Sequence, residues 1–357
     1  MKKTFFILAS ALLMGLTTIS CEKANNSNEM QESILSINII PEDQVQSKAT
    51  GGAHGVQADD NTVQKLEFFV FRAEGADAGM LDAYKMYTAA ELTSLSNLEV
   101  KTTTGKKHIY AVANSHKSDN WAGVKTLADF KAQIASLQSE NNKDFTMTGS
   151  LEAVLQTTTS VTFSISRLVS RVQLASVKTQ FAGTPWAGSS LTNVKMYLIN
   201  AAGDKLYHDG SDQPSPTILN TKKVVATDIN ACTMAGMLYD ETATAITDSG
   251  YNTTHTFYCY ENLLANESAD KKFTKLVIQA DLNGHTYYYP ISINREGFGY
   301  NSSVGHMGIK RNTTYTINVT ILRPGSLDPD TPVEHSTMQA TMNVADWATV
   351  PTVNVIF

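Results

Sequence analysis

Short apolar runs that alternate with polar residues and end on turn residues constrain the fold of this chain most. Between Leu276 and Ile293, two such runs flank Asn283-Gly284. Asn-Gly suits a two-residue type I′ turn, because both central residues of that turn need a positive φ. A later run alternates strictly, with apolar residues at Tyr315, Ile317, Val319 and Ile321. Alternation of this kind is typical of half-buried strands, so the sequence predicts a hairpin followed by a further strand.

Other runs also predict strands, and one segment predicts a helix. The additional strand-like runs are 33–40, 63–72, 108–114, 161–165, 169–177 and 194–198. Between Thr126 and Leu137 the apolar residues fall at helical spacing, and Thr126 is a suitable N-cap. The chain contains no 20–50-residue repeat and no heptad pattern. We therefore expect an all-β fold with minor α content, built from β-sandwich domains.

The composition narrows the class of protein. A chain of 357 residues corresponds to about two domains. Only 17% of the residues are charged, and the formal net charge of −6 argues against a nucleic-acid binder. A hydrophobic fraction of 42% supplies enough apolar material for a core, and three cysteines are too few for a disulfide scaffold. This composition favours an exported β-protein.

The N-terminus predicts a sorting signal. Lys2 and Lys3 precede an apolar run, 5–16, that is too short to span a bilayer. Small residues then lead to Cys21, which resembles a bacterial lipobox, where the cysteine becomes a lipidated N-terminus. An ordinary secretory signal with an incidental Cys21 is the alternative. Residues 22–32 are rich in Asn, Ser and Glu and are typical of a tether.

Two further segments stand out by their position. The polar stretch 41–61 contains three glycines and a single basic residue, Lys48, and is typical of an exposed, protease-sensitive linker. Near the C-terminus, two apolar runs (338–344 and 350–357) follow a spacer rich in Pro and Asp. These runs could complete the last sheet of the chain, or they could serve another molecule.

Residues for catalysis or metal binding do not gather anywhere in the sequence. The Walker, Rossmann, HExxH and G-x-S-x-G patterns are absent, and no two of the eight histidines lie two or four residues apart. We therefore expect no enzyme activity, no metal and no cofactor. Cys232 and Cys259 could form a disulfide or remain two separate buried thiols. Tyr287–Tyr289 could form a sugar-binding face or serve in packing.

Several motifs follow one another along the chain. They are Cys21, the first strand with its linker, I-S-R-L-V-S-R-V at 165–172, R-N-T-T-Y-x-I-x-V at 311–319, R-P-G at 323–325 and the terminal V-A-D-W at 344–347. Together they resemble the Bacteroidales type V pilins, the FimA-type fimbrillins. The resemblance covers nearly the whole chain, and the strand at 311–319 and the terminal V-A-D-W are its most specific parts.

This resemblance implies two tandem β-sandwich domains and a maturation pathway. The implied parts are a signal peptide (1–20), a lipidated propeptide with a removable first strand (21–48), an N-terminal sandwich with the short helix (49–166), a C-terminal sandwich (167–323), and a linker with donor strands (324–357). The removable strand would carry Ile34, Ile37 and Ile39. Family members are commonly cut after Arg, whereas this linker offers only Lys48, followed by Ala49. A protease of different specificity is the alternative.

The resemblance also implies partners and a location. Removing the first strand would leave a groove that accepts the C-terminal strands of another copy, so identical subunits would join head-to-tail. The donor residues would be Met338, Ala340, Met342, Val344, Val353, Val355 and Phe357. The precursor would be an outer-membrane lipoprotein bearing palmitate, and the product would be the shaft of an extracellular fimbria that supports adhesion, with anchor and tip pilins and a maturation protease as partners. A monomeric surface lipoprotein that binds glycans is the alternative.

Overall fold

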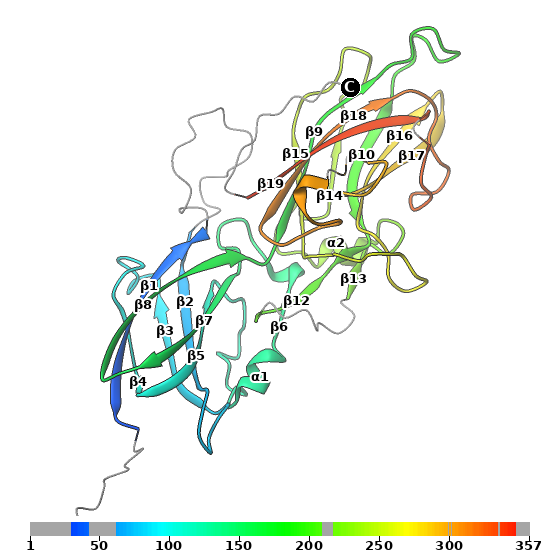
Figure 1. Ribbon diagram of the computed structural model, residues 1–357. Helices are drawn as coiled ribbons and strands as arrows, with labels where there is room; N and C mark the ends of the chain where they lie inside the picture. The colour runs from blue at the N-terminus through cyan, green and yellow to red at the C-terminus, as the bar shows by residue number, and fades with distance from the viewer. Residues whose placement is uncertain are drawn as a thin grey trace, which may run out of the picture. The chain divides into compact units, whose positions relative to one another are not determined.

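Strands are the main regular secondary structure of the described chain, as the alternation of apolar residues predicts. The computed structural model describes residues 30–42, 62–208, 217–298, 300, 302–334 and 336–347. Within these residues no helix has the length and apolar character needed to cross a membrane. The fold is all-β with minor helix, arranged as two β-sandwiches in tandem (Figure 1).

The first sandwich is a seven-stranded sheet in the order β3-β2-β5-β7-β8-β1-β4. Its strands are β1 (Glu32–Pro41), β2 (Lys65–Arg72), β3 (Leu81–Thr88), β4 (Leu98–Thr103), β5 (Gly105–Ala113), β7 (Met147–Leu155) and β8 (Thr158–Arg167). β7 and β8 pair only at Met147/Arg167 and Thr148/Ser166. Beyond that corner the sheet folds over, so that the inner faces of β1, β4 and β8 meet those of β2 and β5 in one apolar core.

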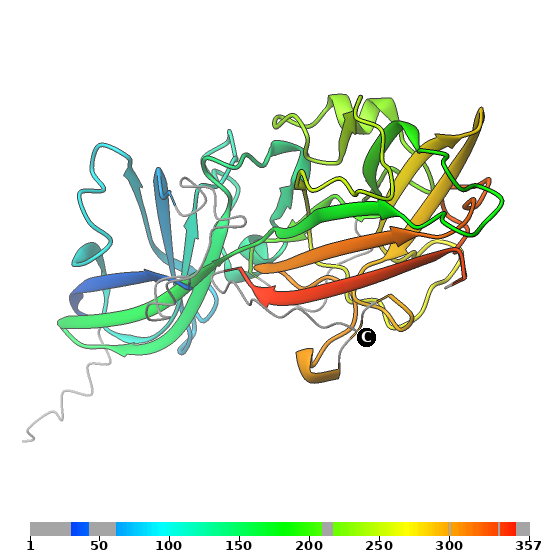
Figure 2. The ribbon, with the colours of Figure 1, turned by 90° about the horizontal axis from the view of Figure 1, so that it is seen from above.

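The second sandwich packs two four-stranded sheets, β14-β10-β16-β17 and β15-β9-β18-β19. In Figure 2, the green β9, the orange β18 and the red β19 run side by side. The strands are β9 (Ser170–Thr179), β10 (Thr192–Ile199), β14 (Tyr239–Thr242), β15 (His255–Cys259), β16 (Lys275–Leu282), β17 (His285–Ser292), β18 (Thr313–Ile321) and β19 (Met338–Asp346). The predicted hairpin joins β16 and β17, with φ of 52° at Asn283 and 82° at Gly284.

The connections hold the short elements. These are α1 (Leu127–Lys131), β6 (Ile134–Ser136), η2 (Leu137–Ser139), β11 (Ala201–Ala202), β12 (Asp204–Leu206), β13 (Ile218–Leu219), α2 (Ala226–Asn230) and η3 (Ser302–Val304). Thr126 caps α1 as predicted, in a capping box with Asp129. The helix is shorter than its spacing predicts, because Ile134 lies in β6, which pairs with β12 about seventy residues later in the chain.

One apolar core extends through both sandwiches. It includes Phe69 and Phe71 on the outer face of β2, which pack against Trp121 and Phe130 of the segment that carries α1. β2 is therefore buried on both faces, which explains its unbroken apolar run. β8 ends at Arg167 and β9 begins at Ser170, and the two residues between them are buried. The domain boundary at 166/167 stays a prediction.

Candidate functional site

The first strand lies between two other strands of its sheet. β1 pairs with β8 in parallel over eight residue pairs, from Ile34/Thr158 to Pro41/Ile165. On its other side it pairs with β4 antiparallel over six residue pairs, from Glu32/Thr103 to Ile37/Leu98. Both edges of β1 are therefore occupied. Without β1, the facing edges of β8 and β4 would lose their hydrogen-bond partners.

Alternate side chains of β1 fill the core of the first sandwich. Leu35 and Ile37 are fully buried and Ile39 is 4% exposed, whereas Ile34 is 43% exposed. Ile34, Ile37 and Ile39 all lie in β1, but the Ile34 side chain faces outward, because neighbouring residues of a strand point to opposite faces. Leu35 fills the core beside Ile37 and Ile39. Counting the period of two back from Ile37 identifies Leu35 as a core residue.

Polar contacts fix both ends of β1. The backbone N–H of Gln31 donates to Thr104 Oγ1 at 3.0 Å, and the Ser33 hydroxyl donates to the carbonyl of Gln156 at 2.5 Å. At the other end, Glu42 Oε2 accepts from Asn312 Nδ2 at 3.0 Å. The strand is therefore held at a defined register along its whole length.

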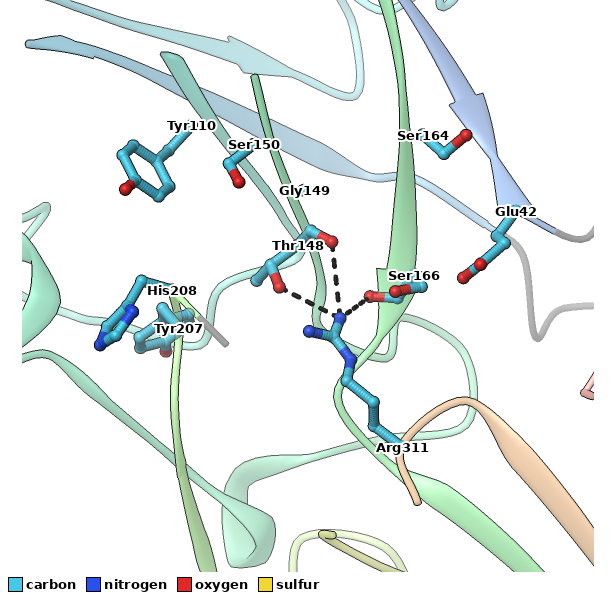
Figure 3. Close-up of a pocket in the computed structure, with 10 residues that line it drawn as sticks. All are labelled: Glu42, Tyr110, Thr148, Gly149, Ser150, Ser164, Ser166, Tyr207, His208 and Arg311. Atoms are coloured by element: carbon cyan, nitrogen blue, oxygen red, sulfur yellow. Dashed lines mark hydrogen bonds between the residues drawn. The ribbon is translucent and has the colours of Figure 1, made fainter. Parts of the chain in front are cut away.

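The end of β1 meets a cluster of buried arginines. Arg167 Nη1 donates to Asn312 Oδ1 at 3.1 Å, and Arg311 donates through Nε to the carbonyl of Arg167 at 2.9 Å. Arg311 also donates to Thr148 Oγ1 at 3.1 Å and to the carbonyl of Ser166. Figure 3 shows this guanidinium, with its bonds to Thr148 and Ser166, at the edge of a pocket of about 190 Å³ that Glu42 also lines. The sequence motifs contain these residues, but nothing in the motifs indicated that they touch one another.

Trp347 fixes the end of β19 in the same region. Its side chain is 1% exposed, with the guanidinium carbons of Arg167 and Arg171 at 4.7 and 4.4 Å from the indole centroid. The ring stacks on Tyr258 at 5.8 Å, and its backbone N–H donates to the carbonyl of Asn312 at 2.9 Å. Asn312 therefore contacts both the end of β1 and the end of β19.

The first of the two C-terminal runs completes the chain's own sheet. β19 pairs antiparallel with β18 from Thr313/Asp346 to Ile321/Met338. Met338 is buried, and the side chains of Ala340, Met342 and Val344 pack against the common core. Of the two alternatives left open by the sequence, the structure shows the first for this run. The remaining donor residues, Val353, Val355 and Phe357, lie outside the described residues.

The processing residues also lie outside the described part of the chain. They are Cys21, Lys48 and Ala49.

The structure has Cys232 and Cys259 as free thiols, so the candidate disulfide is not formed. Cys259 is fully buried in the core, while the Cys232 thiol donates to the carbonyl of Asp228 at 3.3 Å. Burial, together with the charge of Asp228, raises the pKa of the Cys232 thiol to about 11.

The three consecutive tyrosines do not form a sugar platform. Tyr289 is fully buried, and Tyr287 packs against the same core. Tyr288 points to the opposite face of β17, where it contacts a separate small cluster around Tyr197. The alternation of the strand divides the three rings between two faces, which favours packing over glycan binding.

Charged groups in the described residues form structural contacts. No group of three His, Cys, Asp or Glu side chains in the described ranges is placed to hold a metal ion. Asp82 is buried and accepts from Thr102, Thr103 and Arg72, and its carboxylate lies 3.2 Å from Lys107 Nζ. Burial raises the pKa of the Asp82 carboxyl, but these donors outweigh it and hold the pKa below its ordinary value.

Comparison with known proteins identifies fimbrial relatives. The family model described as "Major fimbrial subunit protein (FimA)" matches residues 33–198, and the model described as "FimA4 pilin C-terminal domain" matches residues 255–347. Among curated proteins, the chain is 22% identical over 400 residues to the major fimbrium subunit FimA type-2 of Porphyromonas gingivalis, covering 98% of each chain. It is 23% identical to the major fimbrium subunit FimC of the same species, covering 94% of this chain and 68% of the relative.

Solved structures share the fold. A fimbrilin from Porphyromonas gingivalis superposes with a TM-score of 0.62 at 18% identity, covering 90% of this chain and 99% of the other. A candidate cell adhesion protein from Bacteroides eggerthii superposes with a TM-score of 0.61 at 21% identity, covering 89% and 96%.

Proposed function

The chain belongs to the FimA-type major fimbrillin family, and we propose that it reaches its fimbria as a lipoprotein precursor, loses its first strand to a protease, and polymerises by strand exchange. A structural subunit of a cell-surface fimbria is what its fimbrial relatives support. The observation that supports cleavage and strand exchange is the position of β1, which lies between β8 and β4 and pairs with both.

Maturation begins at the N-terminus. Residues 1–20 direct export, Cys21 carries the lipid that holds the precursor at the outer membrane, and cleavage between Lys48 and Ala49 separates residues 21–48 from the rest. β1 lies within the released segment. While β1 stays seated, no strand can enter, so the precursor cannot polymerise early.

Loss of β1 opens a groove with strong affinity for a strand. Leu35, Ile37 and Ile39 leave the core of the first sandwich, and the edges of β8 and β4 lose their partners. At about 1.5–3 kcal/mol per buried aliphatic side chain, these three residues contribute roughly 5–9 kcal/mol. A replacement strand with the same alternation regains most of that energy.

The donor is the segment that follows Trp347. β19 is paired with β18 along its length and anchored at Trp347, so it stays with its own sheet, while residues 348–357 enter the groove of another copy. Because donor and groove are different surfaces, the contact is head-to-tail and continues into a filament. Anchor and tip pilins end the filament, and the filament supports adhesion at the cell surface.

The test uses the precursor without residues 1–21. Mild trypsin should release the segment that ends at Lys48 and give ladders on native gels and filaments in electron micrographs. The Lys48→Ala variant, which lacks the only basic residue of the linker, should stay monomeric under the same treatment. A variant truncated after Trp347 should be cleaved normally but remain monomeric. A protein that stays monomeric after clean loss of β1, or that polymerises without any cleavage, contradicts the proposal.

A glycan-binding monomer has less support, because the tyrosines that would form its platform are divided between two faces of β17.

A further inference from the structure

The outward-facing side chain of Asn38 forms hydrogen bonds on both sides of β1. Its Oδ1 accepts from the backbone N–H of Asn97, the residue just before β4, at 2.9 Å. Its Nδ2 donates to Thr162 Oγ1 at 3.3 Å and to the carbonyl of Val161 at 3.4 Å, both on β8. The apolar residues on either side of it, Ile37 and Ile39, point into the core.

The contact with Asn97 defines a single register. The ladder between β1 and β4 stops at Ile37/Leu98, and Asn97 has a φ of 56°, which turns its N–H out of the regular pairing. On the other side, β8 presents a hydroxyl at every second residue, namely Thr158, Ser160, Thr162, Ser164 and Ser166. A strand displaced by two residues would still meet a hydroxyl on β8, but it would lose the N–H of Asn97.

The residues around Asn38 follow a pattern that recurs in the chain. A hydroxyl residue, an apolar residue, Asn and a second apolar residue occur at 36–39, 316–319, 341–344 and 352–355. In β18, Asn318 stands opposite Ser176 of the parallel neighbour β9, and the Ser176 hydroxyl donates to Asn318 Oδ1 at 2.6 Å. In β19, Asn343 stands opposite Thr316. Placing Asn opposite a hydroxyl residue on the next strand is therefore a repeated device of this fold.

The fourth occurrence lies in the C-terminal tail. Aligned on the asparagines, Thr352-Val353-Asn354-Val355-Ile356 matches Ser36-Ile37-Asn38-Ile39-Ile40 in residue class at all five positions. In the reversed direction, Ile356 would stand at Ser36 and Thr352 at Ile40, so only the same direction preserves the match. This alignment places residues 348–357 on the ten positions of β1, 32–41.

We propose that Asn354 of one copy takes the place of Asn38 in the groove of another, in the same direction as β1, and so sets the register of the joint. This proposal rests on the proposed function and names the residue that determines register. Val353 and Val355 occupy the seats of Ile37 and Ile39. The Asn354 amide bonds to Thr162 on one side and to the backbone of Asn97 on the other.

The test is disulfide trapping between copies with Asn354 intact. In the register of β1, position 40 stands opposite Ser164 and position 36 opposite Ser160. Copies with Ile356→Cys should therefore cross-link to cleaved copies with Ser164→Cys, and Thr352→Cys should cross-link to Ser160→Cys. All variants carry Cys232→Ser, while the fully buried Cys259 is left in place.

The matched control pairs Thr352→Cys with Thr158→Cys, which lies on the same face of β8 but two residues out of register and leaves Thr162 intact. Its yield should be several-fold lower than that of the Ser160→Cys pair. Adding Asn354→Val keeps a β-forming residue but removes the amide, so the ratio of in-register to shifted cross-links should fall by roughly five-fold, as expected for one hydrogen bond.

Two results would overturn the inference while leaving the proposed function intact. One is a tail-dependent polymer that cross-links best between Thr352→Cys and Ser164→Cys, which means the reversed direction. The other is a register ratio that Asn354→Val leaves unchanged. Absence of both polymer and cross-link after cleavage would overturn the proposed function, and the register assignment with it.

Discussion

Replacing Trp347 by alanine tests whether the C-terminal end of β19 is anchored as the structure shows. The indole is 1% exposed and contacts two guanidiniums, whose carbons lie 4.7 and 4.4 Å from its centroid, and Tyr258 stacks on it. Truncating a buried aromatic side chain costs about 3–5 kcal/mol, and the two cation–π contacts add about 1–2 kcal/mol together. We expect a loss of about 4–7 kcal/mol in the free energy of unfolding, against a total of about 5–15 kcal/mol for an ordinary protein.

The assay is urea unfolding of the uncleaved precursor without its signal, followed by circular dichroism. Because Trp347→Ala could leave too little stability to measure, Trp347→Phe serves as the milder variant. Phenylalanine keeps an aromatic ring beside the guanidiniums, so this variant should lose about 1–2 kcal/mol. Leu327→Ala is the control, since Leu327 is 79% exposed and its truncation should change stability by under about 0.5 kcal/mol.

Amide hydrogen exchange locates the effect. Trp347→Phe should speed the exchange of the β19 amides, 338–346, and leave the amides of β4 unchanged. If Trp347→Ala unfolds within about 1 kcal/mol of the parent, with an unchanged dependence on urea, the indole does not anchor β19 and the reasoning fails.

Three further predictions follow from described contacts. Ile37→Ala should destabilise the precursor by about 2–5 kcal/mol, whereas Ile34→Ala on the exposed face of β1 should cost under about 1 kcal/mol. Equal urea midpoints for the two variants would contradict the assignment of Ile37 to the buried face and Ile34 to the exposed face. The pKa of the Asp82 carboxyl is lower in the folded protein than its ordinary value. The ionised carboxylate therefore stabilises the fold above about pH 4, and this stabilisation is lost as the pH falls further. Asp82→Asn should weaken the loss of stability on acidification, measured as thermal midpoints between pH 2 and 6. In the folded protein at pH 8, iodoacetamide without reductant should label Cys232 and Cys259 only slowly. In urea it should label both thiols. A disulfide would leave both cysteines unlabelled in urea.

Strands with one buried face were predictable from the sequence. β18 and the β16–β17 hairpin alternate clearly, and the Asn283-Gly284 turn has the backbone that its residues require. β3 was missed because its partly buried residues do not alternate and include Asp82, a carboxylate that only its distant partners make tolerable inside the fold. A local pattern cannot report such partners.

Contacts between distant segments explain the remaining differences. Ile134 has helical spacing from Phe130, but pairing with β12 draws it into a strand. The position of β1 between β8 and β4 depends on residues about 60 and 120 positions away. The sequence could therefore indicate a strand, but not that this strand pairs with a neighbour on both edges. The gathering of Arg167, Asn312 and Trp347 likewise depends on the complete fold.

The parallel pairing of β1 with β8 has a mechanical consequence for a filament under tension. Eight residue pairs join the two strands, and β8 leads through Leu168 and Val169 into β9, which in turn pairs in parallel with β18. Hydrogen bonds between strands lie across the strand direction, so a pull along the strands loads them together in shear. A donor in the place of β1 would pass the load to β8, and the main chain would carry it directly into β9. The joint is then expected to resist stretching along the strands better than peeling across them.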